Sequence, residues 1–394
     1  MDVILQILLL LIVAKLFGEL VERAGYPALI GEIGAGILLG PSLLGWVTMN
    51  ETLEVFADIG IIALLFISGA DMNLKSFLER RNVAVTTAVA GVVVPFAGGA
   101  LLGHLLHLSQ SETLFIAIAL SITSIGVSVR ILVDYKQLNS TVGTAIVSAA
   151  VLDDIIGIIL LGVLSAVAMP GTTPASASFP LGILIAVIFL VLFVLIAPRT
   201  LQWVFEWARK TETHEMVYSI AIILALGSAW LSHTAGLHYS IGAFIAGLIL
   251  GDRIRDDRLL FDSLTDFGFG FFVTFFFASI GLLFSFTQET FLSPYIIPLI
   301  VVAVAGKIIG GYIGSLHFLS RAEALLVGLG MTPRGGIELV IAKVALVGGI
   351  IGSALFSAVT VMVIATIIVT PILMKHGFVW ARIGQTEGTQ SDGQ

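Results

Sequence analysis

The chain contains the stretch Gly328-Leu-Gly-Met-Thr-Pro-Arg-Gly-Gly336 inside an apolar segment that covers residues 321–347. Pro333 has no backbone donor and its ring clashes with the preceding helical turn, while the glycines weaken a helix on either side. We therefore predict a helix that is unwound near its middle, with a simple proline kink as the alternative. Unwound backbone at membrane depth is tolerated only where it lines a cavity or is buried in protein, so this break is expected to form part of a site.

The composition indicates the class of protein. Of 394 residues, 58% are hydrophobic and only 11% are charged, and the mean hydropathy is +1.08. A soluble domain needs a more polar surface, so we predict an all-α polytopic membrane protein in contact with lipid. The net charge of −7 comes without the basic stripe that binds nucleic acid. The absence of cysteine excludes a disulfide framework and thiolate metal sites.

Apolar segments of about 20 residues, the length that crosses a bilayer, alternate with charged or Pro/Gly-rich breaks. The loops after odd-numbered segments carry lysine and arginine, whereas the loops after even-numbered segments carry none. By the positive-inside rule, this places the N-terminus outside and the C-terminus in the cytoplasm of a multi-pass cell-membrane protein. About thirteen segments are predicted, at approximately 3–22, 27–47, 54–70, 82–106, 112–133, 140–168, 180–203, 213–234, 237–251, 258–286, 292–316, 321–347 and 352–375.

The two halves of the chain share three short matches in the same order. The matches pair Ile30–Gly40 with Ile241–Gly251, Asp58-Ile-Gly with Asp266-Phe-Gly, and Ile122-Thr-Ser-Ile-Gly126 with Met331-Thr-Pro-Arg-Gly335. An odd number of segments separates each pair, so the halves are predicted to be inserted upside down relative to each other. Such inverted repeats are typical of secondary transporters. Segment 112–133 is the repeat partner of 321–347, and it is therefore also expected to be broken.

Two adjacent aspartates, Asp153 and Asp154, lie in the apolar segment 140–168. A carboxylate at the bilayer centre costs roughly 2.5–3.5 kcal/mol on insertion, so the pair indicates a proton or cation site. Consecutive helical residues point about 100° apart, and the two side chains therefore need different partners. Lys307 is the only deeply placed lysine, and buried charges are paired or neutralised. One aspartate is expected to pair with Lys307, which leaves the other for a cation or a proton.

Other polar residues at membrane depth extend this prediction. The hydroxyls of Thr123 and Ser124, together with carbonyls freed by the breaks, would replace water around a small cation. Arg334 and Glu338 are four residues apart, so they are expected to neutralise each other along one helix face. Glu32, near the end of segment 27–47, is expected to lie at the membrane interface.

As a set, these motifs resemble the monovalent cation:proton antiporter-2 family, and within it the NapA-type sodium/proton antiporters. The resemblance covers essentially the whole chain, and its motifs are Leu152-Asp-Asp154, Thr123-Ser-Ile-Gly-Val-Ser128, Lys307 and Met331-Thr-Pro-Arg-Gly-Gly-Ile-Glu338. It implies an NhaA/NapA-like fold with two crossing broken helices and a homodimer that works by an elevator mechanism. It also implies an ion-transporting core (82–168 and 292–375), a dimerisation scaffold (3–70 and 213–286), a connecting helix (180–203) and a short cytoplasmic tail (376–394).

The resemblance also implies roles for single residues. Asp154 would bind Na⁺ together with Thr123 and Ser124 at the helix crossing, and Asp153 would be the partner of Lys307. The implied activity is electrogenic exchange of Na⁺ or Li⁺ for protons, without a cofactor and without enzymatic chemistry. The sequence Arg334-Gly-Gly-Ile-Glu338 departs from the Arg-Gly-Glu order common in the family and is closer to the potassium-efflux branch. Exchange of K⁺ for protons is therefore the alternative.

Three other functions fit the residues less well. An intramembrane aspartyl protease needs two carboxylates that share a proton, which adjacent residues of one helix cannot do. A sodium-coupled symporter of organic solutes would share the repeat and the broken helices. A cation channel would need a filter and no alternating access. None of the three accounts for the aspartate pair together with Lys307.

Overall fold

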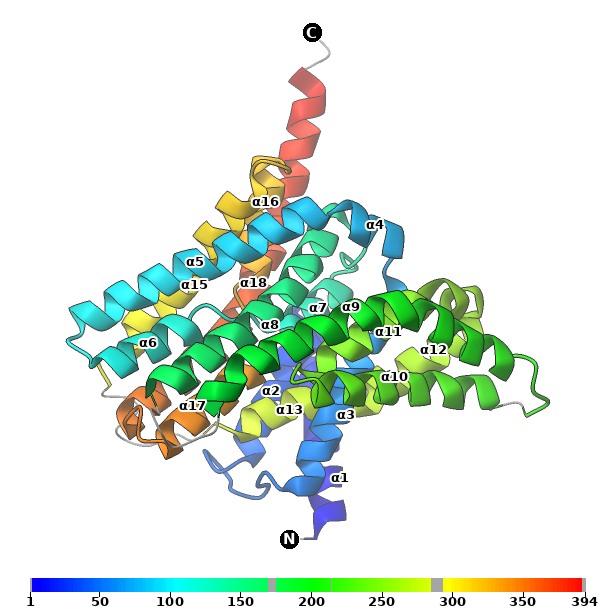
Figure 1. The fold of residues 1–394 in the computed structure, drawn as a ribbon, viewed down its shortest axis with the longest axis horizontal. Coiled ribbons are helices and arrows are strands. Elements are labelled where there is room, and N and C mark those ends of the chain that lie inside the picture. Colours follow the sequence, from blue (N-terminus) through cyan, green and yellow to red (C-terminus); the bar gives the residue numbers. More distant parts are fainter. Residues whose placement is uncertain (1, 169–174, 214, 285–292, 392–394) are drawn as a thin grey trace. The chain divides into compact units, whose positions relative to one another are not determined.

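The computed structural model describes residues 2–168, 175–213, 215–284 and 293–391, and every regular element in these ranges is a helix (Figure 1). Eight helices of the described part are long and apolar enough to cross a membrane. Among the other predicted segments, 112–133 and 321–347 are interrupted, and 27–47 contains a helix of only 12 residues. Some residues of the predicted regions lie outside the described residues. They are 214, 285–286 and 292 of the predicted scaffold and core, and 392–394 of the predicted tail.

The chain divides into two compact units. Unit 1 consists of Met1–Val21, Gly31–Glu79 and Pro170–Ser285, and unit 2 consists of Glu22–Ile30, Arg80–Met169 and Phe286–Gln394. The helices wholly or mostly in unit 1 are α1 (Val3–Arg23), α2 (Ala28–Leu39), α3 (Glu51–Asp71), α4 (Leu74–Glu79), α9 (Ala175–Ala208), α10 (Met216–Thr234), α11 (Tyr239–Asp256), α12 (Arg258–Phe267), the π-helix η1 (Gly268–Phe272) and α13 (Val273–Leu282). Those of unit 2 are α5 (Arg81–Leu105), α6 (Gln110–Ala119), α7 (Ile125–Asp134), α8 (Thr141–Ala168), α15 (Ile296–Ser315), α16 (Arg321–Gly330), α17 (Gly336–Val347) and α18 (Ser353–Ser391).

In unit 1, helices α3 and α11 approach each other so closely that glycine is required at the contact. A Cβ atom on Gly247 would lie against the carbonyl oxygen of Phe66, and one on Gly69 would lie against the carbonyl oxygen of Phe244. A buried apolar cluster surrounds this contact and includes Phe205 of α9. The predicted connecting helix 180–203 thus lies in α9, which packs against α10 and α11 within unit 1.

We expect Gly247→Ala to destabilise the protein by about 2 kcal/mol, because the added methyl group forces two backbones apart. Gly227→Ala is the matched control, since Gly227 lies in α10 and a Cβ atom added there would meet open space within 4 Å. There, alanine is expected to be neutral or stabilising by up to about 1 kcal/mol. The unfolding temperatures of the two purified variants in detergent test this, and equal values would contradict the close helix contact.

The loop between α10 and α11 contains a histidine whose neutral form is needed for structure. The His238 Nδ1 atom accepts a hydrogen bond from the Ser240 backbone N–H at 3.3 Å and so caps the start of α11. Burial, with a smaller contribution from the nearby His233, lowers the pKa of His238 from 6.5 to about 4. Protonation of Nδ1 would remove the cap.

The lowered pKa of His238 predicts a loss of stability in acid. As the pH falls, the unfolded chain binds this proton before the folded chain does. The contribution of neutral His238 to the free energy of unfolding is therefore complete above about pH 6.5 and is lost as the pH falls towards 4. His238→Asn keeps a side-chain acceptor at the cap but removes the titration. We expect the unfolding temperature of this variant to fall less than that of the original chain between pH 7 and pH 4.5, and equal falls would contradict the assignment.

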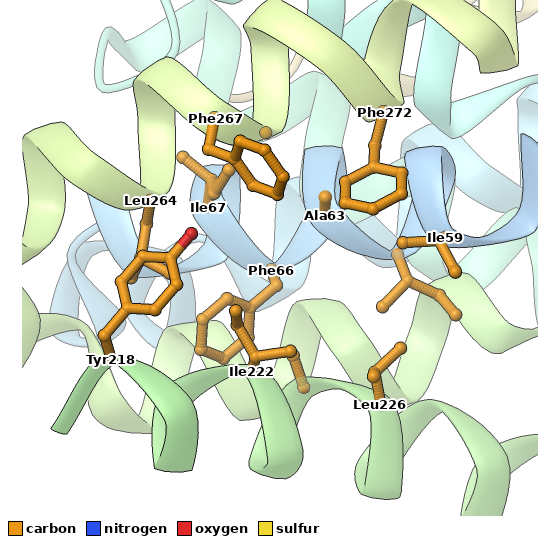
Figure 2. A pocket seen from close by; sticks show the side chains of 13 residues that line it. Ile59, Ala63, Phe66, Ile67, Tyr218, Ile222, Leu226, Leu264, Phe267 and Phe272 are labelled. Carbon is orange, nitrogen blue, oxygen red and sulfur yellow. The ribbon is translucent and has the colours of Figure 1, made fainter. Parts of the chain in front are cut away.

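Unit 1 also contains an apolar pocket of about 60 Å³ (Figure 2). Tyr218, Ile222 and Leu226 of α10 line it from one side, and Phe66 of α3 and Phe272 of η1 are also part of its wall. The lining includes no charged side chain. The pocket is therefore unsuited to hold an ion, and the candidate site lies in unit 2.

In unit 2, glycines again allow close helix contacts. A Cβ atom on Gly310 of α15 would lie 2.6 Å from the Ala90 carbonyl oxygen of α5, and one on Gly311 would lie 2.6 Å from the Cα of Gly328 in α16. Helix α18 continues beyond the predicted segment 352–375 as far as Ser391, so the described part of the predicted tail is helical. Helix α15 thus packs against α5 and α16, and α18 packs against both α15 and α16.

The two interrupted segments begin in the same way. Ser109 and Ser320 each accept a hydrogen bond from the backbone N–H of a glutamate three residues later, and that glutamate bonds back to the serine N–H. These capping boxes fix the first turns of α6 and α16 locally. The sequence interval from Ser109 to Ser320 equals that from Ile30 to Ile241.

Candidate functional site

Both predicted helix breaks are present in the structure. Helix α6 ends at Ala119 and α7 begins at Ile125, while α16 ends at Gly330 and α17 begins at Gly336. Pro333 lies within the second break, where its missing donor leaves no helical bond unmade. The residues between each pair of helices are therefore free to use their backbone groups for contacts outside the helix.

The two breaks contact each other directly. The Ser124 backbone N–H donates to the Pro333 carbonyl oxygen at 2.9 Å, and the Thr123 hydroxyl donates to the Met331 carbonyl oxygen at 3.4 Å. The Ser128 hydroxyl donates to the Gly330 carbonyl oxygen at 2.8 Å. The ends of four helices thus meet at one buried place, where hydroxyl and carbonyl oxygens are concentrated.

Arg334 neutralises the end of the opposite broken helix. Its guanidinium group is fully buried and donates to the carbonyl oxygens of Leu120 and Ile122, which follow α6. The end of a helix carries a partial negative charge, so a cation is stabilised there. Thr366 of α18 holds the backbone of this residue, because its hydroxyl accepts from the Arg334 N–H at 3.1 Å.

Glu338 has a different partner from the one predicted. Its Oε2 atom accepts from the Gly335 backbone N–H at 2.8 Å, at the positively polarised start of α17. The salt bridges within the described ranges do not include one between Glu338 and Arg334. The two side chains therefore do not form a direct salt bridge in the described part of the chain, because each one satisfies the end of a different helix.

We expect Arg334→Met to lower the stability by about 2–5 kcal/mol, since it leaves two buried carbonyl groups without their donor. Arg334→Lys keeps the charge but loses the planar fork that reaches both oxygens. The stability of this variant should therefore lie between those of the original chain and Arg334→Met. Arg209→Met is the matched control, because Arg209 is 45% exposed and contacts Glu206 at 4.0 Å. If the unfolding temperature of Arg334→Met equals that of the control, the capping role is refuted.

The ion pair predicted for Lys307 is present. Its ammonium nitrogen on α15 lies 2.9 Å from Oδ2 of Asp153 on α8, and neither side chain is exposed to solvent. Gly91 of α5 lies beside this pair, since a Cβ atom there would be in van der Waals contact with the ammonium nitrogen at 3.9 Å. Asp153 Oδ1 has no hydrogen-bond partner within the described residues. The charge of Asp153 is therefore balanced by Lys307.

Asp154 belongs to a different face of the same helix. It is 4% exposed, and it lies three residues before Gly157, so the two share one face of α8. A Cβ atom on Gly157 would be 3.3 Å from the Ile122 side chain in the first break. Asp154 therefore lies on the α8 face that meets the broken segment, together with the buried Thr123 and Ser124.

The arrangement can hold a small monovalent cation or a proton. A carboxylate, hydroxyl oxygens and carbonyls of unwound backbone are the hard ligands that such a cation prefers. All seven residues selected from the sequence lie in unit 2, in α8, α15, α17 and the two breaks. Of these residues, Asp154, Thr123 and Ser124 carry side-chain oxygens suited to a cation, whereas Asp153 is paired with Lys307, Arg334 caps the end of α6 and Glu338 caps the start of α17.

Sequence reasoning missed several contributors. Ser128 and Thr366 position the breaks, and only their polarity within apolar helices could have indicated this. Arg130 and Asp134 form a partly buried ion pair on α7 at 3.1 Å, and their spacing of four residues was the available signal. Glu32, which was expected at the membrane interface, is 1% exposed within unit 1 and accepts from the Thr274 hydroxyl at 3.0 Å, and the sequence did not indicate this partner.

Comparison with known proteins gives consistent matches. The family described as sodium/hydrogen exchanger, transmembrane, matches residues 7–378. The chain is 30% identical to the Na⁺/H⁺-K⁺ antiporter GerN of Bacillus cereus over 95% of both chains. It is 29% identical to a Na⁺/H⁺ antiporter of Enterococcus hirae over 94% of this chain and 97% of the other. Its fold is similar to that of the sodium proton antiporter MjNhaP1 of Methanocaldococcus jannaschii, with a TM-score of 0.71, 18% identity and coverage of 95% and 96%.

Proposed function

Because this chain belongs to the sodium/hydrogen exchanger family, we propose that it exchanges a monovalent cation, Na⁺ and also Li⁺, for protons across a membrane by alternating access. The observation that carries the proposal is the position of Asp154. This buried carboxylate is on the α8 face that meets the helix breaks, beside an aspartate whose charge Lys307 already balances. The antiporters among its relatives support the same activity.

The exchange follows from competition for one carboxylate. On the side with few protons, Asp154 ionises and binds the cation with help from the hydroxyls of Thr123 and Ser124 and from carbonyls of the breaks. On the other side a proton displaces the cation. Because a bare carboxylate is costly to move through the membrane, the site crosses readily only when Asp154 is loaded. This selectivity couples the two fluxes, and it requires neither a cofactor nor enzymatic chemistry.

Lys307 supplies the electrogenic part of the proposal. The arriving cation disrupts the ion pair between Lys307 and Asp153, and Lys307 then releases a proton of its own. More protons than cations move in each cycle, so the exchange carries net charge. The support for this step is the short, fully buried contact between the two side chains.

We further propose that about thirteen segments cross the cell membrane, with the N-terminus outside and the C-terminus in the cytoplasm. The matching capping boxes of α6 and α16 support the inverted repeat of an NhaA/NapA-like fold. In the proposed elevator mechanism, 82–168 and 292–375 form the moving core, whereas 3–70 and 213–286 form the scaffold of a homodimer. The division into two compact units supports this assignment.

Exchange of K⁺ for protons is the second candidate. Two observations favour it: the relative GerN is an antiporter of Na⁺ with H⁺ and K⁺, and the chain has the sequence Arg334-Gly-Gly-Ile-Glu338. Sodium remains the first choice because the relative from Enterococcus hirae is a Na⁺/H⁺ antiporter.

The proposal is tested by reconstituting the full chain in liposomes that contain a pH-sensitive dye. Sodium, lithium or potassium is added outside, with and without an ionophore that clamps the membrane potential. We expect Na⁺ and Li⁺ to release protons from acid-loaded liposomes, and the clamp to speed up this release because the exchange carries charge. The absence of cation-dependent proton movement would overturn the function, and a response to K⁺ alone would favour the second candidate.

A further inference from the structure

Glu32 of α2 is a buried carboxylate that the proposed exchange does not use. It is 1% exposed and lies in unit 1, whereas the candidate exchange site lies in unit 2. Its Oε2 atom has no hydrogen-bond partner within the residues that the structure describes. The matching position in the second half of the chain, in Ile241-Gly-Ala243, is an alanine. The repeated architecture therefore does not require an acid here.

Three oxygen atoms gather around this carboxylate. The Thr274 hydroxyl donates to Glu32 Oε1 at 3.0 Å and to the carbonyl oxygen of Phe269 at 3.3 Å. Phe269 lies in the π-helix η1, whose irregular turn is a frequent feature of functional sites. A carboxylate, a hydroxyl and a main-chain carbonyl are hard oxygen ligands, which suit an alkali cation.

The position between these oxygens is held by an ammonium group of the protein. The Lys15 Nζ atom of α1 donates to the Phe269 carbonyl oxygen at 3.0 Å and lies 3.5 Å from Glu32 Oε1. The Lys15 side chain is 43% exposed, so its ammonium group can turn outward and be solvated by water. Glu32 cannot move into solvent in the same way, and a buried carboxylate that loses its counter-charge is strongly destabilised.

We propose that Glu32, the Thr274 hydroxyl and the Phe269 carbonyl form a second monovalent-cation site, which Lys15 closes with its own ammonium group and opens by turning outward. A single carboxylate with neutral oxygens balances one positive charge, so the ligand is an alkali cation such as Na⁺. The site uses no residue of unit 2, so this proposal can be tested independently of the proposed exchange at Asp154.

The test measures binding of radioactive Na⁺ to the purified full chain by equilibrium dialysis in a choline buffer. Asp154→Asn is present in every sample, so that the proposed exchange site does not contribute. Adding Lys15→Met, which removes the competing ammonium, is expected to strengthen binding by about tenfold or more. Adding Glu32→Gln to that variant is expected to abolish the gain, and Thr274→Val is expected to weaken binding.

Lys75→Met is the matched control, because Lys75 is 86% exposed and pairs only loosely with Glu79 at 4.0 Å. It should leave Na⁺ binding unchanged. If Lys15→Met does not yield a monodisperse protein, Lys15→Gln is used for the same comparison. The proposal is overturned if replacing Lys15 does not strengthen Na⁺ binding. It is also overturned if the stronger Na⁺ binding persists after Glu32→Gln is added.

Discussion

Replacing Asp154 with asparagine is expected to abolish cation/proton exchange, with a loss of at least about 100-fold in initial rate. The change keeps the size of the side chain but removes both the negative charge and the titrating group. The cation then has only neutral oxygens at the breaks, and a proton has no carboxylate for which to compete. Asp154 is buried on α8, and the adjacent Asp153 already balances the charge of Lys307.

The measurement for this variant is Na⁺-dependent proton release in liposomes. Asp262→Asn serves as the control, because Asp262 is an exposed aspartate of α12 in unit 1 and should transport at the original rate. Unfolding temperatures of both variants show whether the protein remains folded. A folded Asp154→Asn protein that still exchanges Na⁺ for protons would refute the central assignment.

Replacing Lys307 with glutamine is expected to have two separate effects. It leaves the Asp153 carboxylate buried without its counter-charge, which should destabilise the protein by about 3–5 kcal/mol. It also removes the group that releases the second proton, so the remaining exchange should carry no net charge. The 2.9 Å contact between two side chains with no exposed surface is the reason that both effects should be large.

The double variant Lys307→Gln/Asp153→Asn separates these effects. Neutralising both partners removes the uncompensated charge, so most of the lost stability should return. The exchange should stay electroneutral, because the proton-releasing amine is still absent. Unfolding temperature measures the first effect, and the response of proton release to a clamped potential measures the second. If Lys307→Gln keeps full electrogenic exchange, Lys307 has no part in proton coupling.

The sequence predicts those features that depend on local chemistry. Pro333 and its glycines indicate a break, the length of the apolar segments indicates membrane helices, and the adjacency of Asp153 and Asp154 requires different partners for them. Lys307 could be assigned to an aspartate because the sequence places it near the middle of a predicted apolar segment, where a charge needs a partner. In each case one property of a residue type or of helix geometry decides the result.

Features that depend on distant segments could not be predicted in this way. Arg334 was assigned to Glu338 by their spacing, yet its guanidinium group reaches carbonyls more than 200 residues away. Glu32 was assigned to the interface because no local pattern shows that Thr274 and Lys15 come to it. Such contacts between distant residues depend on how closely the helices approach one another. The helices reach these positions only when the whole unit has packed.

The contact between the two breaks has a consequence for the biogenesis of the protein. The hydrogen bonds that join them connect residues 202–214 positions apart. At a synthesis rate of about 5–20 residues per second, the first break emerges roughly 10–40 s before its partner. During this interval α6 and α7 have unpaired ends inside the translocation machinery or the bilayer. The proposed ion site is therefore among the last parts of the chain to assemble. A chain whose translation stops before residue 330 has Asp153 and Asp154 without the segment that would complete their surroundings.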